Sequence, residues 1–302
     1  MCMVSILMNC WNGEEYLRES IESVFNQSFS DWEIVFIDNC SNDKSAEIAK
    51  SFDKKVKYFK TPYKMTLGEA RAFGVDKCQS QYLMYLDVDD RYRENTVDTL
   101  FDAIHGSNYL VVYSGHRNID SSGRIIGRYN PSSKEGNVFD NLLHQFDVPT
   151  SSLIMNLTMY KESGQTYDKS IIVSAEYNHY LRLAVSHKFK CIKGELTDYR
   201  IHSRGLTIER AEDLHHDRIT TLDSIIREYP ETLTKYPDGF KEAYARADYY
   251  MMRNYLSKDN LESAREVIKP HIFLSLKYFA VYFILFMPSF VRSFIFKLKY
   301  SR

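Results

Sequence analysis

Short apolar runs alternate with amphipathic segments over the first hundred residues of the chain. Runs of this length predict buried strands, and apolar residues that recur every three or four positions predict helices. The runs predict strands at 4–8, 34–37, 56–59 and 82–86. The helical spacing predicts helices that begin at 14, follow the polar turn 38–43, run over 67–77 and cover 97–104. This alternation predicts an α/β fold in which a mostly parallel sheet lies between two layers of helices.

The pattern becomes less regular after residue 104. It predicts a strand at 110–114, a loop or edge hairpin over 117–131, a helix at 138–146, a short strand at 151–156 and a helix at 176–185. Three further helical patterns occupy 213–268. We therefore expect a sandwich domain over 1–210, a helical appendage over 211–270 and an apolar, basic tail over 271–302.

The tail differs in character from the rest of the chain. Its uncharged segment 278–291 is shorter than the roughly 20 residues that cross a bilayer as a helix. Basic residues follow it at Arg292, Lys297, Lys299 and Arg302. An apolar segment with basic flanks predicts a peripheral segment on an anionic membrane surface. The alternative is a helix that docks on the domain or on a second copy of the chain, so that a homo-oligomer is a further expectation.

Composition excludes several classes of protein. Hydrophobic residues make up 44% of the chain and charged residues 26%, as in folded globular proteins. The net charge of −1 gives no basic field for nucleic acid. The five cysteines show no CxxC spacing, which favours reduced thiols in the cytoplasm. Strand-like residues begin at Val4 with no basic segment before them, so we expect no signal peptide.

Three carboxylates follow the predicted strand at 82–86. They are Asp87, Asp89 and Asp90, and they come where the strand leaves the sheet. Ligands of open α/β sheets bind at this end of the strands. Clustered carboxylates repel one another unless a cation lies among them, and oxygen ligands suit Mg²⁺ or Mn²⁺. The alternative is that Asp89 or Asp90 caps the helix that starts near Glu94.

Five segments together resemble a known family. They are, in chain order, VSILMNCWNGEEYL, GEARAFG, YLDVDD, AEYNHYLRL and YRIHSRGLT. Their order and spacing resemble the inverting glycosyltransferases of family 2, which have the GT-A fold, over roughly residues 3–207. Any one of these segments alone is weak support. The resemblance implies a nucleotide diphosphate sugar as donor and a divalent ion, Mn²⁺ or Mg²⁺, as cofactor.

The resemblance assigns the acids and a histidine to the metal and diphosphate. Asp89 matches the acid that binds the ion, and Asp87 is expected near the ribose or the water shell of the ion. His202 matches a histidine that completes the metal or diphosphate site, although alone it would be an ordinary loop histidine. Arg71 matches an arginine that contacts the nucleotide or its phosphates, and otherwise would be a solvated helix arginine. Phosphate contacts are also expected from Arg200 and Arg204.

The nucleotide base is expected at the turns that follow the first two strands. The residues concerned are Asn9, Trp11, Glu14, Asp38 and Asn39. Trp11 stands where the family has Tyr and suits stacking on a pyrimidine, or it covers the core at the turn. Asn39 stands where the family has Asp, and its carbonyl accepts a hydrogen bond without charge assistance. Asp38 matches the first acid of that pair, or caps the following turn.

Glu176 is the expected general base. The family has Asp at this position, before the LRL sequence of the same helix, and the chain keeps a carboxylate with one more methylene. In an inverting displacement such a group takes the proton of the acceptor hydroxyl. The alternative is that Glu176 stabilises the N-terminus of its helix, where an acid is favoured.

The resemblance therefore implies a metal-dependent, hexosyltransferase-like enzyme. It would move a sugar from a nucleotide donor, with UDP expected, to a hydroxyl of a lipid-linked or polysaccharide glycan at the inner face of the cell membrane. The alternative is a degenerate subunit that binds nucleotide sugars or serves as a scaffold, since Asn9, Asn39 and Glu176 depart from the common pattern. The chain has no GxGxxG after a strand, which argues against a dehydrogenase, and no glycine-rich loop after the first strand, which argues against a nucleotidyltransferase.

Overall fold

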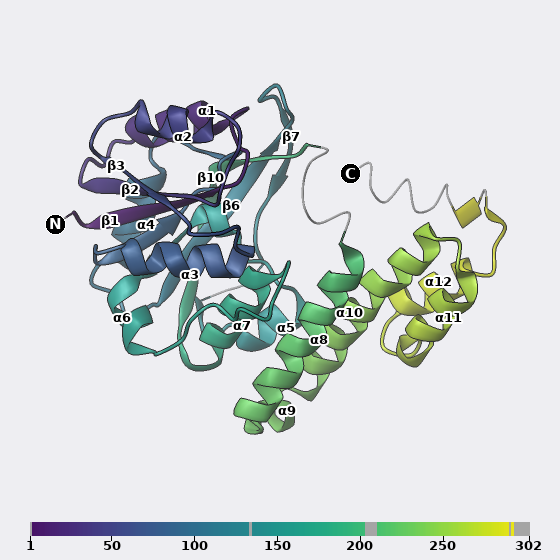
Figure 1. Ribbon diagram of the computed structural model, residues 1–302. Coiled ribbons are helices and arrows are strands. Elements are labelled where there is room, and N and C mark those ends of the chain that lie inside the picture. The colour runs from purple at the N-terminus through teal and green to yellow at the C-terminus, as the bar shows by residue number, and fades with distance from the viewer. Residues whose placement is uncertain (1, 133–134, 203–209, 290, 293–302) are drawn as a thin grey trace. The chain divides into compact units, whose positions relative to one another are not determined.

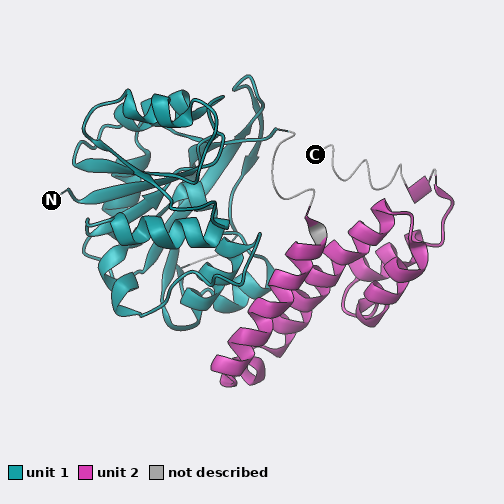
Figure 2. Ribbon diagram, viewed as in Figure 1, with its two compact units in different colours: residues 1–205 teal, residues 206–302 magenta. Residues whose placement is uncertain are grey.

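A computed structural model describes residues 2–132, 135–202, 210–289 and 291–292 of the 302-residue chain. The chain divides into two compact units, residues 1–205 and residues 206–302 (Figure 2), and each is described by itself.

The first unit is built on one sheet. The described residues form ten strands, which are β1 (Val4–Cys10), β2 (Trp32–Asp38), β3 (Val56–Lys60), β4 (Tyr82–Tyr85), β5 (Arg91–Tyr92), β6 (Val111–Ile119), β7 (Ile125–Tyr129), β8 (Glu135–Gly136), β9 (Leu153–Asn156) and β10 (Phe189–Arg200). The main order is β3-β2-β1-β4-β9-β6-β10-β5, with β7 paired to β6 and β8 to β10. The first four strands are parallel neighbours, and β6 and β10 are also parallel.

Helices cover both faces of this sheet (Figure 1). One face packs its apolar side chains, among them Ile6, Ile34 and Met84, against α1 (Leu17–Phe25), α2 (Ser45–Lys50) and α4 (Thr96–Ile104). The opposite face packs against α3 (Leu67–Lys77), and α7 (Ala175–Ser186) lies beside α3. Shorter elements complete the unit, and they are α5 (Phe139–His144), the 3-10 turn η1 (Thr150–Ser152) and α6 (Leu157–Glu162).

The helix α3 approaches the sheet closely at Gly74. A Cβ atom at this position would lie 2.4 Å from Cδ1 of Leu7, so only glycine fits without a shift. The N-terminus of α3 has a capping box, in which Thr66 and Glu69 satisfy each other's backbone N–H groups. These local features agree with the sequence and fix α3 beside the first strand.

The structure confirms the predicted three-layer arrangement with a mostly parallel sheet and C-terminal helices. Two details differ. The helix predicted from Glu14 begins at Leu17, because the N–H groups of Gly13 and Glu14 bind Ser45 Oγ and Asp43 Oδ2 across the turn. The long strand β10 was not predicted.

The second unit is helical. Its elements are α8 (Ala211–Glu228), α9 (Glu231–Lys235), α10 (Pro237–Ser257), α11 (Leu261–Ile268), the 3-10 turn η2 (Lys269–His271) and α12 (Leu276–Ile284). Its apolar core includes Met252, Ile268 and Tyr278, so α12 packs on α10 and α11. No helix in the described part of the chain is both long and apolar enough to cross a membrane. The basic residues Lys297, Lys299 and Arg302 lie outside the described residues.

Candidate active site

The acid loop, residues 86–90, follows β4 at the centre of the sheet and leads to β5. The turn after β1 packs against it, and a Cβ atom on Gly13 would lie only 2.7 Å from Cγ2 of Val88. The N–H of Asp87 donates to Ser151 Oγ of η1 at 3.3 Å. The loop is thus held from both sides, and its carboxylates have defined positions.

Asp89 and Asp90 have separate partners. Nε2 of His202 lies 2.9 Å from Oδ2 of Asp89. The backbone N–H of Arg200 donates to Oδ1 of buried Asp90 at 2.9 Å. Neither acid caps α4, whose N-cap is Asn95. The alternative role of Asp89 or Asp90 as a cap of the helix near Glu94 is therefore wrong.

Burial and mutual repulsion act on these carboxyl groups. The Asp87 side chain is 41% exposed, but the carboxyl group lies deep in the loop, and its burial raises its pKa to about 6. The charge of Arg71 opposes this rise, whereas the charges of Asp89 and Glu176 add to it. Burial, followed by the charges of Asp87 and Asp89, raises the pKa of Asp90 well above its ordinary value. Oδ2 of Asp90 has no hydrogen-bond partner among the described residues. The loop therefore gathers three acids, and the neighbouring basic groups among the described residues neutralise their charge only in part.

Arg71 connects the acid loop to the helix of the expected base. It lies buried on α3, and its Nη2 is 2.7 Å from Glu176 Oε1 and 3.3 Å from Asp87 Oδ1. Burial alone would lower the pKa of Arg71, but the two carboxylates hold it well above its ordinary value. Its Nε and Nη1 atoms have no hydrogen-bond partner among the residues that the structure describes. Arg71 thus brings together Asp87 and Glu176, which are far apart in the sequence.

Glu176 lies in the first turn of α7, whose N-cap is Ser174. Its carboxylate forms an ion pair with Arg71 and is partly exposed. A position in the first turn favours an acid in any case, so its placement is compatible with both roles considered for it. Its catalytic role stays a prediction.

Arg200 is engaged by the protein through all three guanidinium nitrogens. Nη2 pairs with Glu19 Oε2 at 2.6 Å, Nε donates to the carbonyl of Asp89 at 2.9 Å, and Nη1 reaches the carbonyls at 120 and 121. It also lies over the ring of Tyr16. A phosphate contact by Arg200 stays a prediction, and it would require an exchange of these partners. Arg204 lies outside the described residues.

The expected base-binding residues gather at the ends of β1 and β2. Asp38 accepts a hydrogen bond from the Ser41 N–H, as a turn cap would, and another from the Tyr58 hydroxyl. Asn39 binds the segment 61–65 through its side-chain amide, which accepts from the Met65 N–H and donates to its carbonyl.

The end of β1 and the turn after it contribute the remaining three residues. Trp11 is 49% exposed, with Nζ of Lys64 3.2 Å from its ring centroid. Glu14 accepts from the Lys44 N–H, and Nδ2 of Asn9 is buried without a partner among the described residues. The exposed indole remains suited to stacking, and the nucleotide contacts of all five residues stay predictions.

Metal ligands are only partly assembled. Among the described residues, no group of three or more His, Cys, Asp or Glu side chains has the geometry to hold a metal ion. The pair of Asp89 and His202, with Asp87 in the same loop, supplies oxygen and imidazole ligands that Mn²⁺ or Mg²⁺ sites use.

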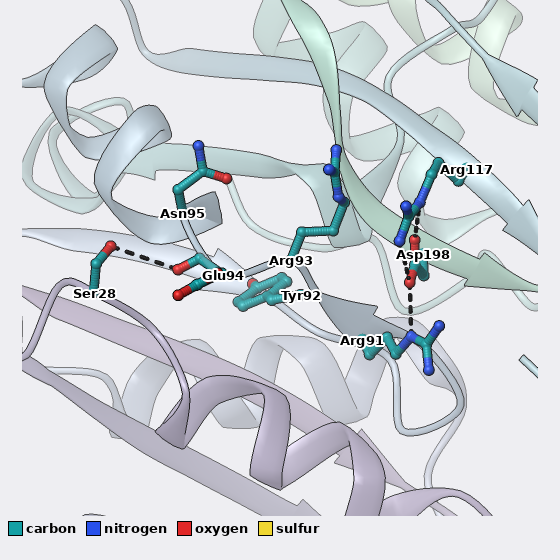
Figure 3. A pocket seen from close by; sticks show the side chains of 8 residues that line it. All are labelled: Ser28, Arg91, Tyr92, Arg93, Glu94, Asn95, Arg117 and Asp198. Atoms are coloured by element: carbon teal, nitrogen blue, oxygen red, sulfur yellow. Dashed lines mark hydrogen bonds and ion pairs between the residues drawn. The ribbon is translucent and has the colours of Figure 1, made fainter.

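A polar hollow of the surface lies elsewhere. It measures about 730 Å³ and is lined by polar and charged side chains, among them Arg91, Arg117 and Asp198 (Figure 3). Asp198 pairs there with Arg91 and with Arg117, each at 2.6 Å. Burial would raise the pKa of Asp198, but these two arginines hold it below its ordinary value. These charges satisfy one another, and we assign no ligand to this hollow.

Comparisons with known proteins identify the class. The sequence model of glycosyl transferase family 2 matches residues 5–161, which is about half of the chain, and the chain belongs to this family. The structure is similar to that of residues 1–349 of TarS from S. aureus, with a TM-score of 0.60 and 14% identity over 88% of this chain and 90% of that one. This likeness shows the GT-A fold. Another structure of the same part of TarS contains UDP-GlcNAc.

Relatives by sequence carry glycosyltransferase names. An uncharacterized glycosyltransferase of Methanocaldococcus jannaschii is 28% identical over 69% of this chain and 74% of its own length. One of Haemophilus influenzae is 32% identical over 44% of this chain and 55% of its own length, and one of Rickettsia bellii is 26% identical over 53% and 23%. The chain thus spans less than two thirds of two of these three relatives.

The sequence pattern did not reveal the internal use of Arg200 or the link through Arg71 between Asp87 and Glu176. Both depend on contacts between distant segments. At both positions the sequence shows only an arginine, and the resemblance had assigned each arginine to contacts with the nucleotide or its phosphates.

Proposed function

We propose that the chain is a metal-dependent, inverting glycosyltransferase that moves a sugar from a nucleotide diphosphate sugar to an acceptor hydroxyl. The observation that carries the proposal is the ion pair of Arg71 with both Asp87 and Glu176. It holds a candidate base beside a loop of acids at the sheet edge where α/β folds bind ligands. The TarS complex with UDP-GlcNAc supports a UDP-sugar as the donor.

Glu176 would act on the acceptor. As the acceptor oxygen forms its bond to the anomeric carbon, the carboxylate takes the hydroxyl proton, and the bond from that carbon to the diphosphate breaks with its electron pair on the diphosphate. A positioned base of this kind contributes about 10²–10⁴ in rate. Arg71 orients this carboxylate and stays charged beside it.

The residues of the acid loop fit a divalent cation. Three carboxylates lie in one short loop, and one of their oxygens is buried without a partner among the described residues. Asp89 and His202 would hold Mn²⁺ or Mg²⁺, with Asp87 as a direct ligand or a partner of its water. Bound there, the ion would neutralise the charge that develops on the departing diphosphate.

The test combines transfer with binding. We expect Glu176→Gln to lower sugar transfer from UDP-sugars by about 10² or more, because the base is lost, while UDP with Mn²⁺ still raises the melting temperature. Asp89→Asn should abolish the part of that rise that depends on Mn²⁺. Glu162→Gln, an exposed glutamate on α6, is the matched control and should behave as wild type.

Two outcomes would change the proposal. Full transfer by Glu176→Gln would remove Glu176 from the mechanism. If the wild-type protein instead binds UDP but releases no UDP from any UDP-sugar, that result would favour the degenerate subunit that only binds nucleotide sugars.

We also propose that α12 carries the protein to an anionic membrane surface. One face of α12 packs in the core of its unit, whereas Leu276, Phe279 and Phe283 of this helix are exposed, as is Phe273 just before it. No acidic residue occurs between Lys269 and Arg292, and both ends of this segment are basic. The exposed aromatic side chains suit insertion into the headgroup region of a bilayer, and the basic residues at both ends suit contact with anionic lipids. A lipid-linked glycan at the inner face of the cell membrane is therefore the acceptor we favour.

Vesicle sedimentation tests this surface. We expect wild type to sediment with vesicles that contain 30% phosphatidylglycerol, and Phe279→Ser with Phe283→Ser to reduce the bound fraction about tenfold or more, since two aromatic anchors are lost. Tyr63→Ser is the control, because Tyr63 is an exposed aromatic residue of the first unit. Equal sedimentation of the double variant, or a concentration-dependent dimer that the double variant loses, would show that the face binds something other than lipid.

A further inference from the structure

Three aromatic rings form a row across neighbouring strands of the first unit. His116 on β6 lies between Tyr129 on β7 and Tyr199 on β10, with ring centroids 5.0 and 5.2 Å away. The strand pairing brings them together, since His116 is opposite Tyr129 in one direction and opposite Thr197, two residues before Tyr199, in the other. We call these three residues the aromatic row.

The row faces the side of the sheet that leads to the acid loop. Side chains alternate along a strand, so Thr197 and Tyr199 share one face and Asp198 and Arg200 the other. The Thr197 hydroxyl donates to the carbonyl of Ser151, whose own hydroxyl accepts the N–H of Asp87. Hydrogen bonds through Ser151 therefore connect the face that carries the row to the acid loop.

The exposure of Tyr199 is unusual for a ring in this position. Tyr199 is 44% exposed, although its strand is otherwise buried at Leu196, Thr197 and Arg200. Partial burial, followed by the negative charges of Asp90, Asp87 and Asp89, raises the pKa of its phenol. The phenol is therefore close enough to the acid loop to interact with these carboxylates. Burial lowers the pKa of His116, which leaves its ring neutral at neutral pH. The row thus presents uncharged rings beside a charged loop.

The order of the strands separates the row from the expected nucleotide site. The acid loop follows β4, the nucleotide turns follow β1 and β2 on one side of β4, and β6 and β10 lie on the other side. A second substrate that approaches the same loop would come from the side of the row. Aromatic faces bind the apolar C–H faces of sugar rings.

We propose that His116, Tyr129 and Tyr199 form the acceptor subsite, in which the rings stack on a pyranose of the glycan that receives the transferred sugar. The assignment of this pyranose as acceptor rests on the proposed function, whereas the binding of a pyranose by the row does not. Tyr199, as the most exposed of the three, makes the main contact.

Saturation-transfer NMR on the full chain with Mg²⁺ and UDP tests the subsite. The probes are the methyl glycosides of β-glucose, β-galactose, α-mannose and N-acetyl-β-glucosamine. We expect saturation of ring C–H protons in at least one of them, and a loss of affinity of about three- to tenfold in Tyr199→Ala, as for the loss of one aromatic partner. Tyr199→Phe should retain most of the affinity, since it keeps the ring. Tyr63→Ala is the matched control.

The outcomes separate this inference from the proposed function. UDP binding, followed by thermal shift in the same variants, should not change, because the row lies on the other side of the acid loop. A glycoside signal unaffected by Tyr199→Ala would overturn the inference, and so would the absence of signal from all four probes, which share the C–H face. Sugar binding at the row without any binding of UDP would uphold the subsite and contradict the proposed function.

Discussion

Arg71 is the residue at which the two halves of the candidate site meet. Its position on α3 was evident from the sequence, because the helix pattern around it is local. That its Nη2 reaches both Asp87 and Glu176 was not evident, since α3, the acid loop and α7 are joined only by the fold. The acids themselves were predictable, because an apolar run that ends in carboxylates is a local pattern.

Removal of the Arg71 charge should destabilise the first unit. In Arg71→Met the carboxylates of Asp87 and Glu176 lose their common cation, and we expect the free energy of unfolding in urea to fall by about 2 kcal/mol. This is less than for a fully buried pair, because both carboxylates keep contact with water. The double variant Arg71→Met with Glu176→Gln should lose less than the sum of the two single variants.

Exposed Arg124 provides the control for Arg71. Its side chain is 82% exposed and pairs with Asp120 in its own turn, so Arg124→Met should change stability by no more than about 0.5 kcal/mol. Additivity in the double variant would show that Arg71 and Glu176 are not coupled in solution.

At the scale of elements, β10 marks the limit of prediction from this sequence. The segment 189–200 includes Lys193 and Gly194, and its pairing with β6 shifts register between Cys191 and Thr197. Gly194 has a φ of +120°, a conformation that favours glycine and interrupts the alternation of a strand. The local pattern is therefore lost, although β10 supplies Arg200, leads to His202 and carries the ring of Tyr199.

The strands β1 to β4 contrast with β10. Each is a short run of mostly apolar residues, and each pairs in parallel with a neighbour whose pattern is equally clear. Elements of this kind were located to within a few residues, whereas the aromatic row, which depends on the mutual pairing of β6, β7 and β10, had no signal in the sequence. The proposed acceptor subsite could thus be inferred only from the structure.

At the scale of the whole molecule, the two units differ in how their stability depends on pH. In the first unit, burial and the nearby Arg71 and Arg182 lower the pKa of His179 from 6.5 to about 3. Its ring stacks on Tyr167 at 3.8 Å, and it remains neutral in the folded state. Its contribution to stability is present above pH 6.5 and is lost as the pH falls toward 3, because the unfolded chain binds the proton first.

The second unit has a different acid-sensitive group. Burial would raise the pKa of Asp248, but hydrogen bonds from His215 and His271, at 2.9 and 2.7 Å, hold it below its ordinary value of 3.8. Its contribution is therefore present above pH 3.8 and is lost only below that value as Asp248 becomes protonated. Between pH 6.5 and 4.5 this carboxylate gives no change.

Unfolding in urea at several pH values tests this difference, because both tryptophans, Trp11 and Trp32, belong to the first unit. We expect the free energy of unfolding from tryptophan fluorescence, taken as wild type minus His179→Gln, to fall between pH 6.5 and 4.5 by up to about 1.4 kcal/mol per pH unit, since His179 takes up one proton on unfolding. The raised pKa values of Asp87 and Asp90 act in the opposite direction in both proteins and cancel in this difference. The corresponding difference between wild type and His144→Gln, at an exposed histidine, should stay constant over this range. The helical circular dichroism signal should keep a component that His179→Gln leaves unchanged, because the helices α8 and α10 belong to the second unit. A fluorescence slope equal in wild type and His179→Gln would contradict the assignment of the proton to His179.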